Sequence, residues 1–304
     1  MGAPRFGAVV TAMVTPFDES GRLDLDGAVT LARWLVDHGS DGLLLAGTTG
    51  EGPVLTDAER LDLWRAVAAA VSVPVIASTG TNDTRHSVEL TQAAGPTGVD
   101  AVLVVTPYYN RPSQDGLLEH FVAVARSTSL PVMLYDIPVR TGRRIAPATV
   151  HRLLEATSNV VAVKDAAGDP AGAARLLAQA PEGFELYSGD DSLTLPLLAV
   201  GAAGVVSVAS HWAGTEMAEM LAAFRKPDPD AARAANARLV DSYDFESTDA
   251  FPNPLPAKAA CRALGLPVGQ CRPPMGAAPP ELDGEAARLI SRLGSPAGAG
   301  GLVA

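Results

Sequence analysis

The sequence predicts an α/β protein, a (β/α)₈ TIM barrel followed by a C-terminal helical appendage. Short apolar runs alternate with amphipathic segments, which predicts parallel strands that are joined by helices. Eight such units follow one another at intervals of roughly 25 residues, and this number favours a closed barrel over an open, doubly wound sheet.

The eight expected strands consist mainly of β-branched and small apolar residues. They cover residues 6–15, 42–46, 73–78, 101–106, 132–136, 160–164, 184–187 and 204–208. Helices are expected at 24–38, from about 56, 84, 114 and 146 onward, and around 174–179 and 192–200. Thr56 with Glu59 three residues later has the pattern of a capping box, which predicts a helix start at that point.

More helices follow the eighth strand than a barrel needs for closure. They are expected at 214–224, 230–243, 256–264 and 280–293. We therefore assign residues 1–225 to the barrel and 226–294 to a C-terminal helical region. The Gly/Ala-rich residues 295–304 are expected to form a frayed tail.

Composition limits the partners and the compartment. A net charge of -11 argues against nucleic acid and anionic membrane surfaces as partners. Cys261 and Cys271 are too few for a disulfide framework and suit a reducing cytosol. The five histidines lack the spacing of a metal site. The N-terminal run GAVVTAMV is followed by Pro16 and indicates a strand rather than a signal peptide or membrane span, so we expect a soluble, cytoplasmic protein.

Polar motifs follow six of the expected strands. In a (β/α)₈ barrel the carboxyl ends of the strands meet at one rim, where the chemistry takes place. We therefore expect one site to be formed by GTTGE, TGTN, TPYYN, YDIPVR, Lys164 and SGDD.

Lys164 interrupts a buried apolar pattern at the end of VVAV. Lysine is rarely fully buried unless it is paired or functional. An unperturbed lysine is neutral only about one time in a thousand at physiological pH, so a nucleophilic lysine needs a site that lowers its pKa. The alternatives are a side chain that extends to the protein rim or an ion pair with Asp165.

The GTTGE segment, which contains Thr48 and Thr49, offers successive backbone N–H groups and two hydroxyls. Such a turn can hold a small carboxylate, although it can also be an ordinary βα turn. The chain contains no glycine-rich nucleotide-binding motif, so nucleotide binding has no support.

Phenols and one arginine lie on two neighbouring loops. Tyr108 and Tyr109 follow the fourth strand, and Tyr135 ends the fifth. A phenol at a strand end can relay protons or can simply cover the barrel mouth. The planar guanidinium of Arg140 can bind a carboxylate through two hydrogen bonds. The alternative interpretation is that Arg140 is an ordinary surface arginine.

Asp190 and Asp191 are adjacent carboxylates that could suggest acid–base work on a glycoside. Consecutive side chains point in different directions, however, and an aspartate before SLTLPLLAV is first of all a helix N-cap. We therefore favour the cap.

A candidate lysine nucleophile, proton-relaying hydroxyls and donors for a carboxylate together indicate Schiff-base chemistry on a 2-oxo acid. This chemistry requires no metal and no organic cofactor.

The motifs resemble those of a known family over nearly the whole chain. They are TAMVTPF, GTTGE, TPYYNRPSQ, YDIPVRTG, VAVKDA, YSGDD, GVVSV and PNPLPAK, in this order. The chain resembles the pyruvate-dependent class I aldolase family of dihydrodipicolinate synthase and N-acetylneuraminate lyase. Its motifs are most similar to those of the synthase branch, a lyase group that condenses pyruvate with aspartate 4-semialdehyde in diaminopimelate and lysine biosynthesis.

The resemblance implies roles for several residues. Lys164 forms the Schiff base with pyruvate, and Tyr135 is the proton shuttle, linked through Thr48 to Tyr109. In this family that last tyrosine reaches across a dimer interface into the neighbouring active site. Thr49 holds the pyruvate carboxylate.

The resemblance also implies the remaining binding residues and the assembly. Gly189 and Val206 line the pocket near the lysine, and Arg140 binds the carboxylate of aspartate 4-semialdehyde. The family is typically a homotetramer, built as a dimer of dimers.

Two features depart from the family pattern. Synthases usually continue GTTGE with serine, where this chain has Gly52 and then Pro53. Members inhibited by lysine bind it near the positions of Tyr108 and Asn82, which are present here. The histidine and glutamate positions of that cleft are Asp57, Arg60 and His86 in this chain. These replacements argue against inhibition by lysine.

Two other functions remain open. A pyruvate-dependent aldolase or lyase acting on N-acetylneuraminate or a 2-keto-3-deoxy sugar acid would use the same lysine chemistry. A catalytically silent barrel that binds metabolites is the third hypothesis, although an intact set of Lys164, Tyr135, Tyr109 and Thr48 argues against it.

Overall fold

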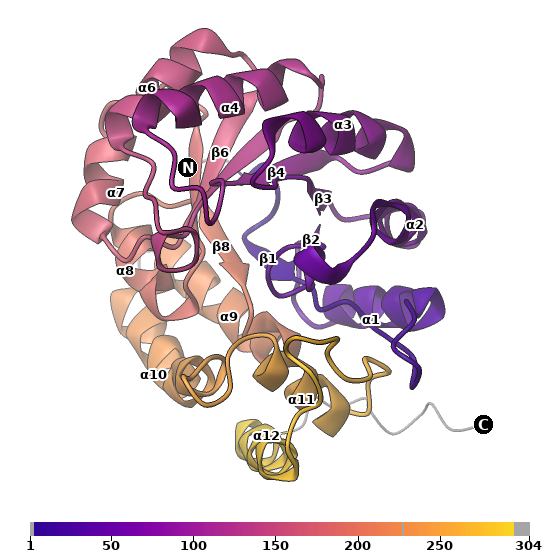
Figure 1. Cartoon of the computed structure of the whole chain (residues 1–304). Coiled ribbons are helices and arrows are strands. Elements are labelled where there is room, and N and C mark those ends of the chain that lie inside the picture. Colours follow the sequence, from indigo (N-terminus) through magenta and orange to yellow (C-terminus); the bar gives the residue numbers. More distant parts are fainter. Residues whose placement is uncertain (1–2, 227, 295–304) are drawn as a thin grey trace.

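Eight parallel strands close into a barrel in the computed structural model, which describes residues 3–226 and 228–294 (Figure 1). Each strand pairs with the next along the chain, and the last pairs with the first, which confirms the predicted fold. The strands are β1 (Val9–Ala12), β2 (Gly42–Leu45), β3 (Val75–Ser78), β4 (Ala101–Val105), β5 (Val132–Asp136), β6 (Val160–Asp165), β7 (Glu185–Ser188) and β8 (Gly204–Ser207).

Helices surround the barrel and cover its outer face (Figure 1). They are α1 (Leu25–Asp37), α2 (Asp57–Ala68), α3 (Thr84–Ala94), α4 (Gln114–Arg126), α5 (Pro138–Thr141), α6 (Pro147–Ala156), α7 (Pro170–Leu177), α8 (Thr194–Ala199) and α9 (Ser210–Arg225), with single 3₁₀ turns η1 (Gly52–Val54), η2 (Gly95–Thr97) and η3 (Asp191–Leu193). The capping box at α2 is confirmed, because the Thr56 side chain accepts from the Glu59 amide and the Glu59 carboxylate accepts from the Thr56 amide.

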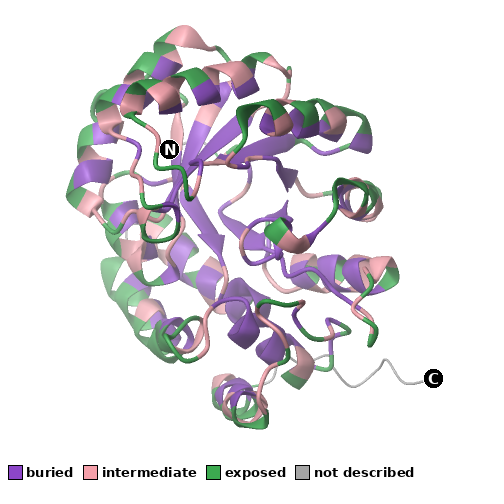
Figure 2. Cartoon of the chain, in the orientation of Figure 1, coloured by how far each residue is buried: buried purple, intermediate pink, exposed green. Residues whose placement is uncertain are grey.

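Two apolar clusters lie on the two faces of the sheet. The inner cluster fills the barrel with side chains such as Val10, Leu44 and Ile76, and the larger outer one packs the strands against the helices. Figure 2 accordingly shows the strands buried and the outer helix faces exposed. Strand residues alternate between the two clusters, and this alternation decides which side chains at a strand end can face the barrel mouth.

The first strand is shorter than expected, since 6–15 was predicted and only Val9–Ala12 is paired. Phe6 and Met13 lie outside the ladder and are still buried. The apolar pattern therefore marks burial beyond the paired segment.

Three further helices follow α9 and lie together beside the barrel (Figure 1). They are α10 (Pro229–Phe245), α11 (Leu255–Ala263) and α12 (Pro280–Leu293), so the expected C-terminal helices are present. α10 packs on α9, and α11 packs on both α9 and α12. The division at 225/226 remains our proposal, and the tail expected at 295–304 lies outside the described residues.

Helix α9 starts at Ser210, four residues before the predicted start at 214.

Within the described ranges, no helix combines the length and the apolar character that a membrane crossing requires.

Candidate active site

Lys164 ends the apolar run of β6 inside the barrel mouth, with only 5% of its surface exposed. It pairs in register with Tyr135 of β5, and its Nζ lies 4.3 Å from the centre of that ring. Asp165 belongs to the opposite face of the sheet, where its charged neighbours are Arg144 and Asp169. Within the described part of the chain Lys164 forms no ion pair, so the Lys164–Asp165 pair considered from the sequence is not formed.

Burial lowers the pKa of Lys164 from its ordinary 10.5 to about 8. The negative charge of Asp191 opposes this shift, while the positive charge of Arg140 adds to it. At pH 7 about one such amine in ten is neutral, against about one in three thousand for an unperturbed lysine. The buried site therefore increases the fraction of Lys164 in the neutral, nucleophilic form.

Tyr135 ends β5 and is 4% exposed. Burial raises its pKa to about 12, although Arg140 and the Thr48 side chain act in the opposite direction. The phenol is therefore protonated at neutral pH and can donate its proton to a group beside Lys164.

The GTTGE loop has an unusual backbone. Ala46, just before it, and Glu51, its last residue, both have φ near 54°, in the left-handed region that side chains rarely adopt. Thr49 is buried, and its hydroxyl oxygen accepts a hydrogen bond of 3.0 Å from the Asn253 amide. Since that oxygen is already used as an acceptor, the hydroxyl hydrogen is free to be donated to a carboxylate.

Gly189 and Val206 are the residues that the resemblance expects to line the pocket near the lysine. A side chain at Gly189 would meet Lys164 Cγ at 2.9 Å, so the glycine makes room for the lysine stem. Val206 is buried in the inner apolar cluster together with Tyr135. Their role in binding stays a prediction.

A pocket of about 210 Å³ opens beside Tyr135, the neighbour of Lys164, while Lys164 itself is not among the lining residues. Its lining includes Thr48, Tyr108, Tyr135 and Arg140. Arg140 is exposed, and in the described residues it has no carboxylate partner, so its guanidinium is available to a ligand. The lining of the pocket therefore includes both a guanidinium and a phenol.

Tyr109 is not brought to this pocket. Its side chain is 91% exposed and its φ is 73°, in the loop after β4. Arg140 is exposed as well, but it lines the pocket, as does Tyr108, the neighbour of Tyr109.

The two adjacent aspartates diverge, as the helix-cap interpretation predicts. Asp190 caps η3 by accepting from the Ser192 amide at 3.0 Å. Asp191 turns into the interior, where one carboxylate oxygen accepts from the amides of Val208 and Ala209 at 2.7 and 2.9 Å.

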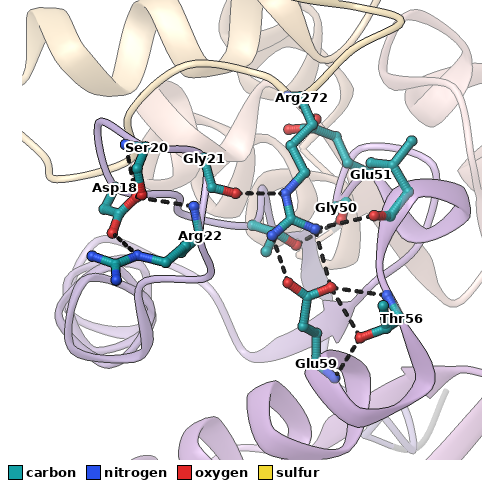
Figure 3. A network of polar contacts seen from close by, with 11 residues as sticks. Asp18, Ser20, Gly21, Arg22, Gly50, Glu51, Thr56, Glu59 and Arg272 are labelled. Carbon is teal, nitrogen blue, oxygen red and sulfur yellow. Dashed lines mark hydrogen bonds and ion pairs between the residues drawn. The ribbon is translucent and has the colours of Figure 1, made fainter.

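A polar network from the C-terminal region supports the GTTGE loop (Figure 3). The Arg272 amide donates to Glu51 at 2.8 Å, and its guanidinium binds both Glu59 and the Gly21 carbonyl. The other Glu51 oxygen lies 2.7 Å from Lys258 Nζ, and both side chains of this ion pair are buried. The appendage thus holds the segment that carries Thr48 and Thr49.

Gly52, where the family usually has serine, has no room for a side chain. A Cβ there would lie 2.2 Å from the Ala46 carbonyl oxygen. The Gly52 carbonyl accepts from Arg60 Nη2 at 2.7 Å. The loop after GTTGE is therefore built around glycine in this chain.

Two residues that contribute to the site, Asn253 and Glu246, were not identified from the sequence. Asn253 binds Thr49 from 204 positions away, and Glu246 places a carboxyl group near Lys164. The PNPLPAK motif contains Asn253 but carried no assigned role, and Asp191, in the predicted SGDD motif, was interpreted only as part of a helix cap.

Known proteins resemble this chain along almost its full length. The sequence model described as the Dihydrodipicolinate synthetase family matches residues 5–293. The 4-hydroxy-tetrahydrodipicolinate synthase of Moorella thermoacetica is 51% identical over 292 residues, which are 95% of this chain and 99% of that protein.

Two solved structures have the same fold. The dihydrodipicolinate synthase of Cyanidioschyzon merolae with lysine bound has a TM-score of 0.91 at 41% identity, covering 95% of this chain and 98% of that one. The chloride-inhibited enzyme of Acinetobacter baumannii complexed with pyruvate has a TM-score of 0.89 at 32% identity, covering 95% and 99%. The family resemblance predicted from the motifs is confirmed: the chain belongs to the dihydrodipicolinate synthetase family.

Proposed function

We propose that the chain catalyses the 4-hydroxy-tetrahydrodipicolinate synthase reaction of lysine biosynthesis, a lyase activity, in the cytoplasm. The observation that carries this proposal is a desolvated lysine with a pKa of about 8 that lies against a protonated phenol in a barrel mouth. The identity to synthases that carry this name supports the same activity.

The neutral amine of Lys164 attacks the ketone of pyruvate, and loss of water gives an iminium. The iminium withdraws electrons, so a methyl proton is lost and an enamine forms. The enamine carbon attacks the aldehyde of aspartate 4-semialdehyde, and the product cyclises as the substrate amine displaces Lys164. Tyr135 supplies and removes protons, and Thr49 donates to the pyruvate carboxylate.

Turnover with pyruvate and aspartate 4-semialdehyde tests the proposal. No turnover of this pair, together with cleavage of N-acetylneuraminate or a 2-keto-3-deoxy sugar acid, would replace it by the aldolase hypothesis. Pyruvate that binds without being reducible onto the protein would support the silent barrel.

Arg140→Ala separates the synthase from the aldolase hypothesis. We expect kcat/KM for the semialdehyde to fall by about 10–100-fold, because a charge-assisted bond to its carboxylate is lost. Borohydride trapping of pyruvate on Lys164 should change far less. The control is Arg152→Ala, which breaks an exposed ion pair with Asp115 between α6 and α4. An Arg140→Ala enzyme with unchanged kcat/KM contradicts the assignment.

The free amino acid lysine is expected to inhibit this enzyme little, although the relative from Cyanidioschyzon merolae binds it. In the cleft near Tyr108, Asp57 is already paired with His86 at 2.9 Å, and the buried Arg60 presents a positive charge. A second cation is repelled there, so lysine should change the steady-state rate by less than about twofold. Strong inhibition in a lysine titration would show that this cleft still accepts an amine.

Tyr109 belongs, in our proposal, to the active site of a second copy in a homotetramer. Its exposure of 91% and its left-handed backbone support a side chain that is presented to a partner rather than to its own pocket. Tyr109→Phe should lower kcat by about 10-fold or more without changing the sedimentation coefficient, since only a relay hydroxyl is removed. A monomer of full activity in sedimentation and assay would refute this proposal.

A further inference from the structure

Glu246 brings a carboxyl group toward Lys164 from the C-terminal helical region. It follows the last residue of α10, and its amide donates to the Ser242 carbonyl. The residue is partly exposed, yet its carboxyl oxygen Oε2 is buried. Because α10 packs against η3, this carboxyl lies beside that of Asp191.

Two carboxylates cannot share a hydrogen bond unless one of them carries a proton. Asp191 Oδ1 and Glu246 Oε2 are both buried, and neither has a donor among the described residues. The second oxygen of Asp191 already accepts two backbone amides, so only Oδ1 lacks a partner. A proton on Glu246 gives both orphaned oxygens a partner.

We propose that Glu246 and Asp191 share one proton, and that this pair holds a single negative charge beside Lys164 and so sets the charge state of the amine. The inference rests on the proposed Schiff-base function of Lys164. Glu246 acts through its partner and is a positioning residue.

The charges around the pair agree with this inference. Burial, Asp191 and Asp190 all raise the pKa of Glu246 well above its usual range, while Lys164 opposes them. Lys164 itself lies near both acids, Asp191 and Glu246, and near the positive charge of Arg140. Tyr243, on α10, has its pKa raised by burial and by the same acids and stays a neutral phenol.

A single negative charge suits both states of the lysine. Two ionised carboxylates would stabilise the ammonium and slow its attack on the ketone. No charge would leave the iminium, a fixed cation, without a counter-ion in a buried site. One shared proton permits both the neutral amine and the cationic intermediate.

The test is the pH dependence of borohydride trapping of pyruvate in four proteins: wild type, Glu246→Gln, Asp191→Asn and the double variant. In Glu246→Gln the remaining carboxylate keeps one negative charge, so the midpoint should stay within about 0.3 pH units of wild type. In Asp191→Asn burial keeps Glu246 protonated, so the midpoint should fall as in the double variant. The double variant removes the charge, and its midpoint should fall by about one unit or more. A purely structural role would not give this pattern.

A lower midpoint in Glu246→Gln alone would show two charges in the wild type and overturn the proposal. An unchanged midpoint in a folded double variant would overturn it as well. Asp244→Asn is the matched control, because this exposed acid lies two positions earlier on α10.

Infrared difference spectra keep the inference testable if the double variant does not fold. Wild type minus Glu246→Gln should contain the carbonyl stretch of one protonated carboxylic acid, and wild type minus Asp244→Asn should not. Absence of this band from wild type minus Glu246→Gln refutes the shared proton. The measurement needs no pyruvate, so it separates failure of this inference from failure of the proposed function.

Discussion

Lys164→Ala is expected to lower kcat/KM by a factor on the order of 10³ or more, because the covalent route through the Schiff base is closed. Borohydride with pyruvate should add a reduced three-carbon adduct to the wild type and nothing to the variant. Mass spectrometry of the intact protein and of its peptides measures both.

The chain is well suited to this experiment because it contains three lysines, Lys164, Lys226 and Lys258. Lys258 is fully buried in an ion pair with Glu51, and Lys226 is exposed on the surface. Lys226→Ala is therefore the control, which should keep full trapping and turnover. An adduct that persists in Lys164→Ala would show that the nucleophile has been assigned wrongly.

The same site predicts a gain of stability on removal of the amine. The folded pKa of Lys164, about 8, lies below the ordinary 10.5, so the unfolded chain binds more protons between these pH values and stability rises with pH across this window. Below pH 8 the cost of the buried charge is fully present. At pH 7 the free energy of unfolding of Lys164→Met should therefore exceed that of wild type by ~1–3 kcal/mol. A clear loss would indicate that the ammonium is stabilised in the site.

The strand ends explain why so much of the site could be predicted from the sequence. Alternating apolar runs predict parallel strands, and closure brings their carboxyl ends to one rim, so Lys164 and Tyr135 become neighbours without any knowledge of side-chain contacts. The capping box at Thr56 and the cap at Asp190 were predictable for a similar reason, since both depend on contacts within a few residues.

The contributions of the C-terminal region could not be predicted in this way. Asn253 and Glu246 lie outside the eight strand–helix units, and their partners Thr49 and Asp191 are far away in sequence. No local periodicity specifies how the appendage packs on the barrel, because that packing depends on the shapes of two surfaces formed by distant segments. The role of Tyr109 in a second copy likewise rests on the family resemblance and stays a prediction.

Lys258→Met is expected to cost ~3–5 kcal/mol in the free energy of unfolding, because Glu51 would remain buried without its cation. The GTTGE loop should also become more mobile, because its last residue, Glu51, has a left-handed backbone that the ion pair helps to hold. Lys258 lies on α11, and Asn253, which binds Thr49, comes just before this helix. We therefore expect KM for pyruvate to rise by about 10-fold, with a smaller change in kcat. Urea unfolding and steady-state kinetics measure the two effects.

Arg65→Met provides the matched control, since it breaks an ion pair with Asp62 in which both side chains are 56% exposed. Such a pair is worth about 1 kcal/mol or less. Glu51→Gln combined with Lys258→Met removes both buried charges and should recover part of the lost stability, because no unpaired charge remains. If Lys258→Met costs no more than Arg65→Met, the ion pair does not hold the loop. The support would then come from Arg272, which donates to the same carboxylate and also binds Glu59.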